Sequence, residues 1–260
     1  MRQIKHFIAL GLMLVFSWGA FASSDSHGAM EESPHNVRDW MSLQRGAKYY
    51  VNYCQGCHAL SLMRYQRLAE DTRMVDKDGF VLEDIVKTNL LFNGDKVSDQ
   101  ILTSMKESDG KNWFGKAPPD LSLVARRRGA DWLYTYLKSF YLDNGTTWGV
   151  NNAIFPNVGM PHVLAELQGE QKAIYKEVVN VVEGKEHKSE VLSHLELEKE
   201  GALSEAEYNK VVADIVNFLV YVAEPMQLKR QQIGIWVILF LFVFTGLAYL
   251  LKREYWRDIH

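Results

Sequence analysis

The sequence Asn52-Tyr-Cys-Gln-Gly-Cys-His-Ala-Leu60 contains both cysteines of the 260-residue chain. Two residues separate Cys54 from Cys57, and His58 follows directly. Two cysteines cannot build the disulfide framework that stabilises many small secreted domains. The chain must therefore be held together by a hydrophobic core, by a bound group, or by both.

The Cys-x-x-Cys-His pattern is the attachment signature of c-type haem. Two thiols on one helical turn can each bond a vinyl group of the same haem, and the adjacent imidazole then faces the iron. We therefore predict one covalently attached haem c. Cys54 and Cys57 would carry its thioether bonds, and His58 would be an axial ligand of the iron.

Three other kinds of site also use paired cysteines. A thiol–disulfide oxidoreductase carries its motif after a strand of a βαβ unit, and the sequence shows no such pattern. A disulfide between Cys54 and Cys57 would close a very short loop and add little stability. A zinc site needs four ligands, and no second Cys/His pair lies near in the sequence. We keep an anchored thiol–disulfide oxidoreductase using Cys54 and Cys57 as the alternative from another class.

A low-spin haem needs a second axial ligand, which is commonly methionine or histidine. Met160 follows Gly159, which permits close approach of the backbone, and precedes Pro161, which keeps Met160 extended. We predict Met160 as this ligand, and His162 is its chief rival. The remaining methionines downstream of the motif have less suitable surroundings: Met63, Met74, Met105 and Met226.

Three consecutive arginines, residues 126–128, stand out in an otherwise acidic domain. Arginine pairs with carboxylates through a planar fork, so Arg126 or Arg128 is a candidate for holding a haem propionate. Cations are also favoured at the C-terminal end of a helix, which is a purely structural explanation for the same residues.

Both ends of the chain contain apolar runs. Arg2 and Lys5, an apolar stretch and Ala20-Phe-Ala22 are typical of a secretory signal. The uncharged run Ile233–Leu251 spans about 28 Å as a helix, close to the thickness of the bilayer core. These features predict four parts: a signal peptide (1–22), a haem-binding domain (23–225), a linker with a transmembrane anchor (226–251) and a tail (252–260).

The signal predicts a single-pass protein of the bacterial inner membrane, with its domain in the periplasm and its C-terminus in the cytoplasm. The chain carries a formal net charge of −3; the leader contributes +2 and residues from Met226 onward +3, which leaves −8 for the domain. Such a domain is a poor partner for nucleic acid. It can attract a basic protein.

Apolar spacing and capping signals predict a mainly α fold of the c-type cytochrome kind with long loops. The charged segment 166–200 fits either a helical pair or a hairpin. We expect helices near residues 39–53, 82–91, 122–128, 131–141 and 204–224, helical continuation over 60–70, and loops over 106–119 and 143–161.

An ordered set of segments resembles the cytochrome c1 family, the haem subunits of quinol–cytochrome c reductase (cytochrome bc1) complexes. The resemblance covers nearly the whole mature chain. Its segments are Gly46–His58 (GAKYYVNYCQGCH), Met63-Arg64-Tyr65, Ala117–Ser122 (APPDLS), Gly159-Met160-Pro161, Val216–Pro225 (VNFLVYVAEP) and the C-terminal anchor.

The resemblance implies an electron-transfer subunit of the respiratory chain that is not an enzyme as an isolated chain. It would pass single electrons from the Rieske iron–sulfur protein to cytochrome c, beside cytochrome b in the bilayer, as part of a dimeric complex. The same haem chemistry would also suit an anchored monohaem cytochrome that donates to another terminal oxidase or reductase. The family's propionate arginine falls within residues 126–128.

Overall fold

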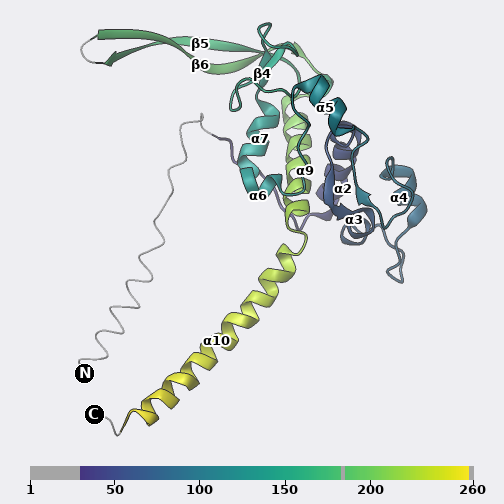
Figure 1. Cartoon of the computed structure of the whole chain (residues 1–260), viewed down its shortest axis with the longest axis vertical. Coiled ribbons are helices and arrows are strands. Elements are labelled where there is room, and N and C mark those ends of the chain that lie inside the picture. Colours follow the sequence, from purple (N-terminus) through teal and green to yellow (C-terminus); the bar gives the residue numbers. More distant parts are fainter. Residues whose placement is uncertain (1–29, 183–184, 258–260) are drawn as a thin grey trace.

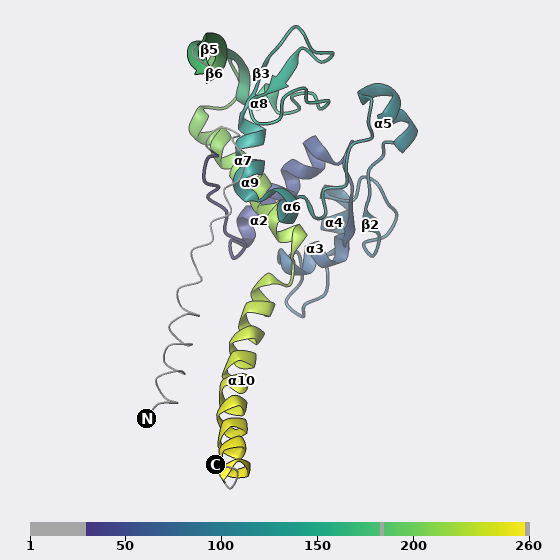
Figure 2. The same cartoon turned by 60° about the vertical axis from the view of Figure 1, so that its left-hand side comes forward.

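The computed structural model describes residues 30–182 and 185–257. The predicted signal peptide lies outside these residues. A helical body forms the centre of the chain, a long hairpin projects from one end of it, and helix α10 leaves from the other end (Figures 1 and 2). The mainly α fold is confirmed.

Helices α2 (Trp40–Tyr49) and α9 (Glu205–Ala223) pack against each other in the middle of the body. Gly46 permits this contact, because a Cβ at this position would overlap the carbonyl oxygen of Asp214 in α9. Any larger side chain at residue 46 would therefore push apart the two helices that carry the core.

Both helices begin at side-chain caps, and the sequence predicts the one at Ser204. The carboxylate of Asp39 accepts hydrogen bonds from the backbone N–H groups of Met41 and Ser42, which start α2. Ser204 and Glu207 form a reciprocal capping box at the start of α9. These side chains satisfy N–H groups that a helix leaves without partners, so local sequence fixes where each helix starts.

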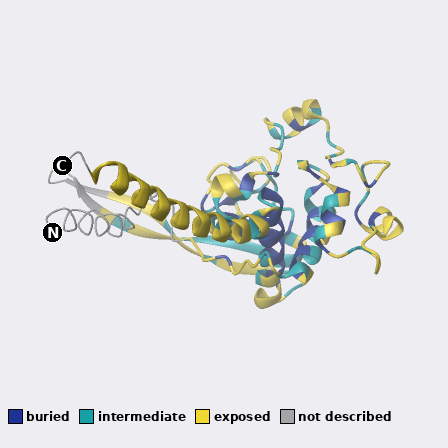
Figure 3. Cartoon of the chain, turned by 90° about the horizontal axis from the view of Figure 1, so that it is seen from below, coloured by how far each residue is buried: buried dark blue, intermediate teal, exposed yellow. Residues whose placement is uncertain are grey.

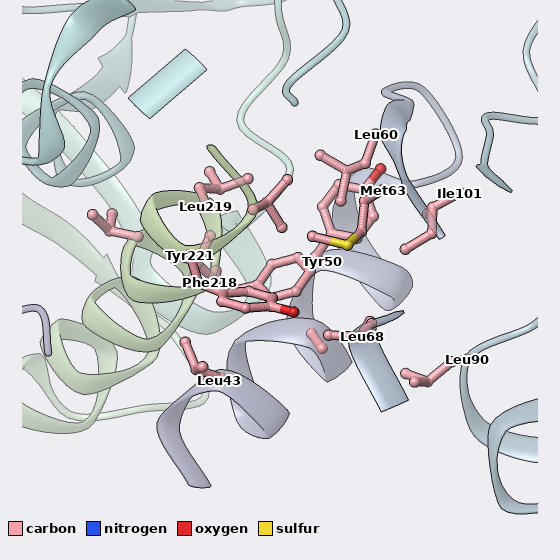
Figure 4. Close-up of a cluster of buried hydrophobic side chains, with 14 of the residues drawn as sticks. Leu43, Tyr50, Leu60, Met63, Leu68, Leu90, Ile101, Phe218, Leu219 and Tyr221 are labelled. Atoms are coloured by element: carbon pink, nitrogen blue, oxygen red, sulfur yellow. The ribbon is translucent and has the colours of Figure 1, made fainter. Parts of the chain in front are cut away.

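The core lies between α9 and the segments around α2. Tyr50 is 1% exposed, and its ring centroid lies 5.6 Å from that of Phe218 (Figure 4). Met63 and Leu68 continue this core on the other side of Tyr50. Buried residues are concentrated here, whereas the peripheral loops are mostly exposed (Figure 3).

Shorter helices complete the body. Two of them differ from the sequence prediction, because residues 106–119 were expected to be a loop yet contain α5, and α7 ends before residue 141. The helices are α3 (Tyr65–Asp71), α4 (Glu83–Asn89), α5 (Glu107–Phe114), α6 (Val124–Arg128), α7 (Ala130–Lys138) and α8 (Ala165–Gln168).

The described residues contain three antiparallel two-stranded sheets. The sequence predicted only one of them, the hairpin that was one of two alternatives for residues 166–200. The prediction of a helix over residues 60–70 is wrong for the first half, which forms a strand that pairs with β2. The prediction of a loop over residues 143–161 is wrong for the three residues of β4. The pairs are β1 (Leu60–Arg64) with β2 (Gln100–Ile101), β3 (Phe140–Leu142) with β4 (Val150–Asn152), and β5 (Gly169–Val182) with β6 (Lys185–Glu200).

Strands β5 and β6 form the projecting hairpin, so the second alternative for residues 166–200 is confirmed. β5 is rich in valine, and β6 alternates leucine with glutamate over residues 195–198, features that suit strands. Gln171 attaches the base of the hairpin to the body, because its side-chain amide donates to the backbone oxygens of Lys138 and Phe140 at 2.9 and 2.8 Å.

Helix α10 (Gln227–Tyr255) has 29 residues, and it is long and apolar enough to cross a membrane. At 1.5 Å per residue it extends for about 43 Å. Its large apolar side chains are exposed along its length (Figure 3). A helix without a polar face and without protein packed around it is typical of a membrane span.

Candidate haem site

The cysteine motif lies at the end of the central helix. After α2 the chain continues as the π-helical turn η2 (Tyr50–Cys54), and the backbone N–H of Gln55 donates to the carbonyl oxygen of Tyr50 at 2.9 Å. The buried hydroxyl of Tyr50 donates to the backbone oxygen of His58 at 2.6 Å. Tyr50, a residue of the core, therefore bonds to the motif twice: its backbone oxygen accepts from Gln55 and its hydroxyl donates to His58.

The imidazole of His58 has one nitrogen committed to the protein. Its Nδ1 lies 2.7 Å from the backbone oxygen of Pro119, which can only accept a hydrogen bond, so Nδ1 carries the proton. Burial lowers the pKa of His58, although the contacts with Pro119 and Asp120 oppose this. A neutral imidazole with a free Nε2 lone pair is the form that binds a metal, and such an outer hydrogen bond fixes its orientation.

Asp120 holds the loop that supplies the Pro119 oxygen. Its carboxylate accepts hydrogen bonds from the backbone N–H of Ser61 at 2.9 Å and that of Ser122 at 2.8 Å. Partial burial raises the pKa of Asp120, but the hydrogen bonds from Ser122 and Ser61 outweigh it and the net shift is downward. The carboxylate thus fastens the Pro119 loop to strand β1, directly after the motif.

Cys54 and Cys57 are both free thiols. Burial raises the pKa of Cys54 to about 12, with a further contribution from Cys57, and burial also raises the pKa of Cys57. Redox-active cysteines have lowered pKa values, because the thiolate is the nucleophile. Within residues 30–182 and 185–257 no group of His, Cys, Asp or Glu forms a metal site. The surroundings thus suit neither thiol exchange nor zinc.

The second predicted ligand, Met160, lies in a loop that two asparagines hold. The side-chain oxygen of Asn152 accepts from the backbone N–H of Ile154 at 3.1 Å and of Phe155 at 3.2 Å. That of Asn151 accepts from the N–H of Asn157 at 2.8 Å. Asn152 is fully buried. Side-chain amides therefore replace regular secondary structure in setting the path of this loop.

The same loop is joined to helix α7. The amide nitrogen of Asn152 donates to the backbone oxygen of Tyr136 at 2.8 Å. The hydroxyl of Tyr136 in turn lies 3.4 Å from the sulfur of Met160, to which it donates. Burial raises the pKa of Tyr136, so the phenol is neutral and retains its donor proton. Met160 is thus half-buried against a defined polar partner.

His162, the rival ligand, is engaged elsewhere. Its ring lies parallel to that of Phe140, with centroids 4.9 Å apart and an interplanar angle of 1°. Burial lowers its pKa to about 4, although Gln168 opposes the shift, so the ring is neutral near pH 7. The ring is held against strand β3, but its buried Nε2 has no hydrogen-bond partner, so the choice of Met160 over His162 stays a prediction.

Helix α5 lies between the loop of Pro119 and the loop of Met160. A Cβ at Gly110 would lie 2.7 Å from the side chain of Pro118, and a Cβ at Gly159 would lie 3.3 Å from the backbone oxygen of Phe114. The ring centroids of Phe114 and Trp148 are 5.0 Å apart. The loop of Pro119, which bonds to His58, and the loop of Met160 therefore both contact helix α5.

The two candidate propionate residues have different surroundings. The guanidinium of Arg126 lies 3.4 Å from the carboxylate of Glu224, just before the anchor. That of Arg128 lies over the rings of Trp132, 4.8 Å from its centroid, and Phe155, 5.7 Å away. Arg128 is thus placed beside the Met160 loop and Arg126 beside the anchor, and both roles remain predictions.

Comparison with known proteins identifies the family. The sequence profile described as the Cytochrome C1 family matches residues 30–259. Cytochrome c1 of Allochromatium vinosum is 47% identical over 253 residues, which cover 97% of this chain and 99% of the relative. The chain belongs to the cytochrome c1 family. Members carry one covalently bound haem c and are membrane-anchored subunits of cytochrome bc1 complexes, so the cofactor prediction is confirmed.

Two further relatives differ widely in their identity to this chain. A protein named ammonia monooxygenase gamma subunit, from Nitrosomonas europaea, is 42% identical over 260 residues and covers 100% of both chains. Mitochondrial cytochrome c1 heme protein of Neurospora crassa is 26% identical over 235 residues, with 84% of this chain and 62% of that protein covered.

The residues of this chain fit haem c by their donor chemistry. Two free thiols precede a neutral imidazole that presents one nitrogen, and a thioether lies in a fastened loop. Sequence analysis missed the residues that hold these groups: Tyr50, Pro119, Asp120, Tyr136, Asn151 and Asn152. The paired prolines before Asp120 and the paired asparagines were visible in the sequence, but their partners are distant along the chain.

Proposed function

We propose that this chain passes single electrons from the Rieske iron–sulfur protein to cytochrome c within a quinol–cytochrome c reductase. The observation that carries the proposal is the imidazole of His58, which immediately follows two free thiols and has its Nδ1 fixed by Pro119 at 2.7 Å. Membership of the cytochrome c1 family supports the assignment of the complex.

Each site residue has one role in this proposal. Cys54 and Cys57 would form the thioether bonds, and His58 and Met160 would ligate the iron. The haem supplies the one-electron couple. Because Pro119 and Tyr136 hold the two ligand side chains, their positions change little between the oxidised and reduced states, which keeps the reorganisation cost of electron transfer small.

The placement in the cell follows from the two ends of the chain. We place residues 23–225 in the periplasm of a bacterial inner membrane, residues 226–251 in the linker and anchor, and residues 252–260 in the cytoplasm, after removal of residues 1–22. The acidic domain would then meet a basic cytochrome c by electrostatic attraction. Cytochrome b would lie beside the anchor, in a dimeric complex.

The alternatives make different predictions. A thiol–disulfide oxidoreductase is disfavoured by the raised pKa values of Cys54 and Cys57. An anchored cytochrome that donates to another oxidase or reductase keeps the same haem site but has other partners. The name of the Nitrosomonas europaea relative points to ammonia monooxygenase, so subunits of that enzyme are a further set of partners to look for.

The test is purification of the full chain, tagged at its C-terminus, from detergent-extracted membranes of its host. We expect a reduced-minus-oxidised spectrum of c-type haem, a mass increased by one haem, and co-purification of cytochrome b and a Rieske protein that reduces this chain when quinol is added. A bare polypeptide mass would reject the haem assignment. Haem without these two partners would reject the complex.

The axial ligands are tested with a matched pair of variants. Met160→Leu should convert the six-coordinate haem to a form with an open position, which is visible as a high-spin spectrum. Met226→Leu removes a methionine between α9 and the anchor and should leave the spectrum unchanged. An unchanged spectrum in Met160→Leu would exclude Met160 as the ligand.

A further inference from the structure

The contact between Tyr136 and Met160 is more than packing. The phenol oxygen lies 3.4 Å from the thioether sulfur, within the range of a hydrogen bond to sulfur. A thioether sulfur is a weak acceptor, whereas a phenol is a good donor. Tyr136 therefore contacts the atom of Met160 that is proposed to bind the iron.

Aromatic neighbours fix the ring of Tyr136 from several sides. It stacks on Trp132 with centroids 4.8 Å apart and an interplanar angle of 11°. It meets Phe140 edge-on at 5.2 Å and Phe155 at 6.4 Å. A ring enclosed in this way cannot swing out, so the direction of its hydroxyl is determined by the fold.

The backbone of Tyr136, like its hydroxyl, is hydrogen-bonded to the Met160 loop segment. Asn152 donates to the Tyr136 carbonyl at 2.8 Å, and the same side chain accepts from the N–H of Phe155 at 3.2 Å. Phe155 in turn packs against the Tyr136 ring. Helix α7 and the Met160 loop are thus joined by several contacts, which hold the hydroxyl of Tyr136 beside the sulfur of Met160.

We propose that Tyr136 is a positioning residue that orients the Met160 thioether and raises the reduction potential of the haem; this inference rests on the proposed ligation by Met160. A thioether sulfur has two lone pairs. When one is donated to iron, the other can accept the hydroxyl proton of Tyr136. This hydrogen bond withdraws electron density from sulfur, weakens its donation to ferric iron, and so favours the ferrous state.

Tyr136→Phe tests the proposal, since it removes the hydroxyl and keeps the ring with its aromatic packing. The full chain in its complex is titrated with redox mediators and monitored by absorption. We expect the potential to fall by an amount that changes the ferric-to-ferrous ratio at least threefold, about 28 mV for one electron. The absorption of the ferric sulfur–iron bond should also change.

Tyr134→Phe is the matched control, because Tyr134 is a buried tyrosine of the same helix with its ring beside Lys138, 4.7 Å from the ammonium. Its potential should equal that of the wild type. A potential in Tyr136→Phe that matches this control would overturn the proposal and leave Tyr136 a packing residue, even if both variants lose thermal stability.

A second measurement covers the case in which Tyr136→Phe does not mature. In the ferrous wild-type protein, nuclear magnetic resonance should show a slowly exchanging Tyr136 hydroxyl proton close to the Met160 methyl group. Its absence would overturn the proposal. Met160→Leu separates the two proposals. If Met160→Leu loses the sixth ligand and the potential of Tyr136→Phe is unshifted, only the hydrogen bond is rejected. If Met160→Leu keeps its six-coordinate haem, both the ligand assignment and the hydrogen bond are rejected.

Discussion

The two sides of the candidate haem site are built by different means. On the His58 side, the motif follows the central helix directly and is held by Tyr50, a core residue eight positions away. On the Met160 side, a long loop is held by two asparagines and one tyrosine through side-chain hydrogen bonds. The first side inherits its rigidity from the hydrophobic core, and the second depends on a small number of polar contacts.

This difference has an energetic consequence. Burial of apolar surface is spread over many contacts, so losing one of them perturbs the site little. A buried amide that satisfies several backbone groups has no substitute, and each group left without a partner costs about 1–3 kcal/mol. We therefore expect the Met160 side to be the more easily released, and the following variants test that expectation.

His58→Ala should have the largest effect, because it removes an iron ligand outright. Replacing even an outer partner of a metal ligand typically costs roughly 10–100-fold in metal affinity, and loss of the ligand itself should exceed this. We expect no low-spin haem in membranes that contain this variant, as measured by absorption and by haem staining. His35→Ala, at an exposed histidine near the start of the described chain, is the control. A normal low-spin spectrum would contradict the assignment.

Asn152→Ala should come next. It leaves the N–H groups of Ile154 and Phe155 without their partner and removes one of the hydrogen bonds to the carbonyl of Tyr136, so we expect a loss of about 3 kcal/mol in the free energy of unfolding. It should also produce a high-spin fraction, since the Met160 loop loosens. Chemical denaturation and absorption measure the two effects. Asn144→Ala, at an exposed position of the turn between β3 and β4, should behave like the wild type. Equal stability of the two variants would refute this role of Asn152.

Tyr50→Phe should have a smaller effect, on the other side of the site. It removes the hydroxyl that donates to the carbonyl of His58 at 2.6 Å but keeps the buried ring. We expect about 1 kcal/mol of destabilisation and an unchanged spin state, because the core still holds the motif. If this variant released an axial ligand more readily than Asn152→Ala does, the contrast between the two sides would be reversed.

Asp120→Asn should have the smallest effect, and one that depends on pH. The folded pKa of Asp120 lies below its usual value of 3.8, since the hydrogen bonds from Ser122 and Ser61 outweigh partial burial. The carboxylate therefore contributes stability that is present above pH 4 and lost as the pH falls through the folded pKa. We expect the stability gap between wild type and variant to be below about 1 kcal/mol at pH 7 and to shrink toward pH 3. A gap that widens on acidification would show that the sign is wrong.

The sequence predicted what depends on neighbouring residues and missed what depends on distant ones. The helix starts near Asp39 and at Ser204 and the long apolar helix near the C-terminus follow from short patterns, and they agree with the structure. Strand β1 reads as helical continuation because its partner β2 lies about 40 residues later. The side-chain partners of Asn152 and the backbone partner of His58 are set by tertiary folding, so no local pattern marks them.

The short connection between α9 and α10 has a consequence for how electrons reach the site. Three residues, Glu224–Met226, separate the two helices, and Glu224 is paired with both Arg126 and Arg230. Since α9 packs directly on the helix that carries the cysteine motif, the height of the proposed redox centre above the bilayer is set by the protein itself. In the proposed complex, a donor tethered in the same membrane would then search a thin layer at that height rather than the whole volume of the compartment.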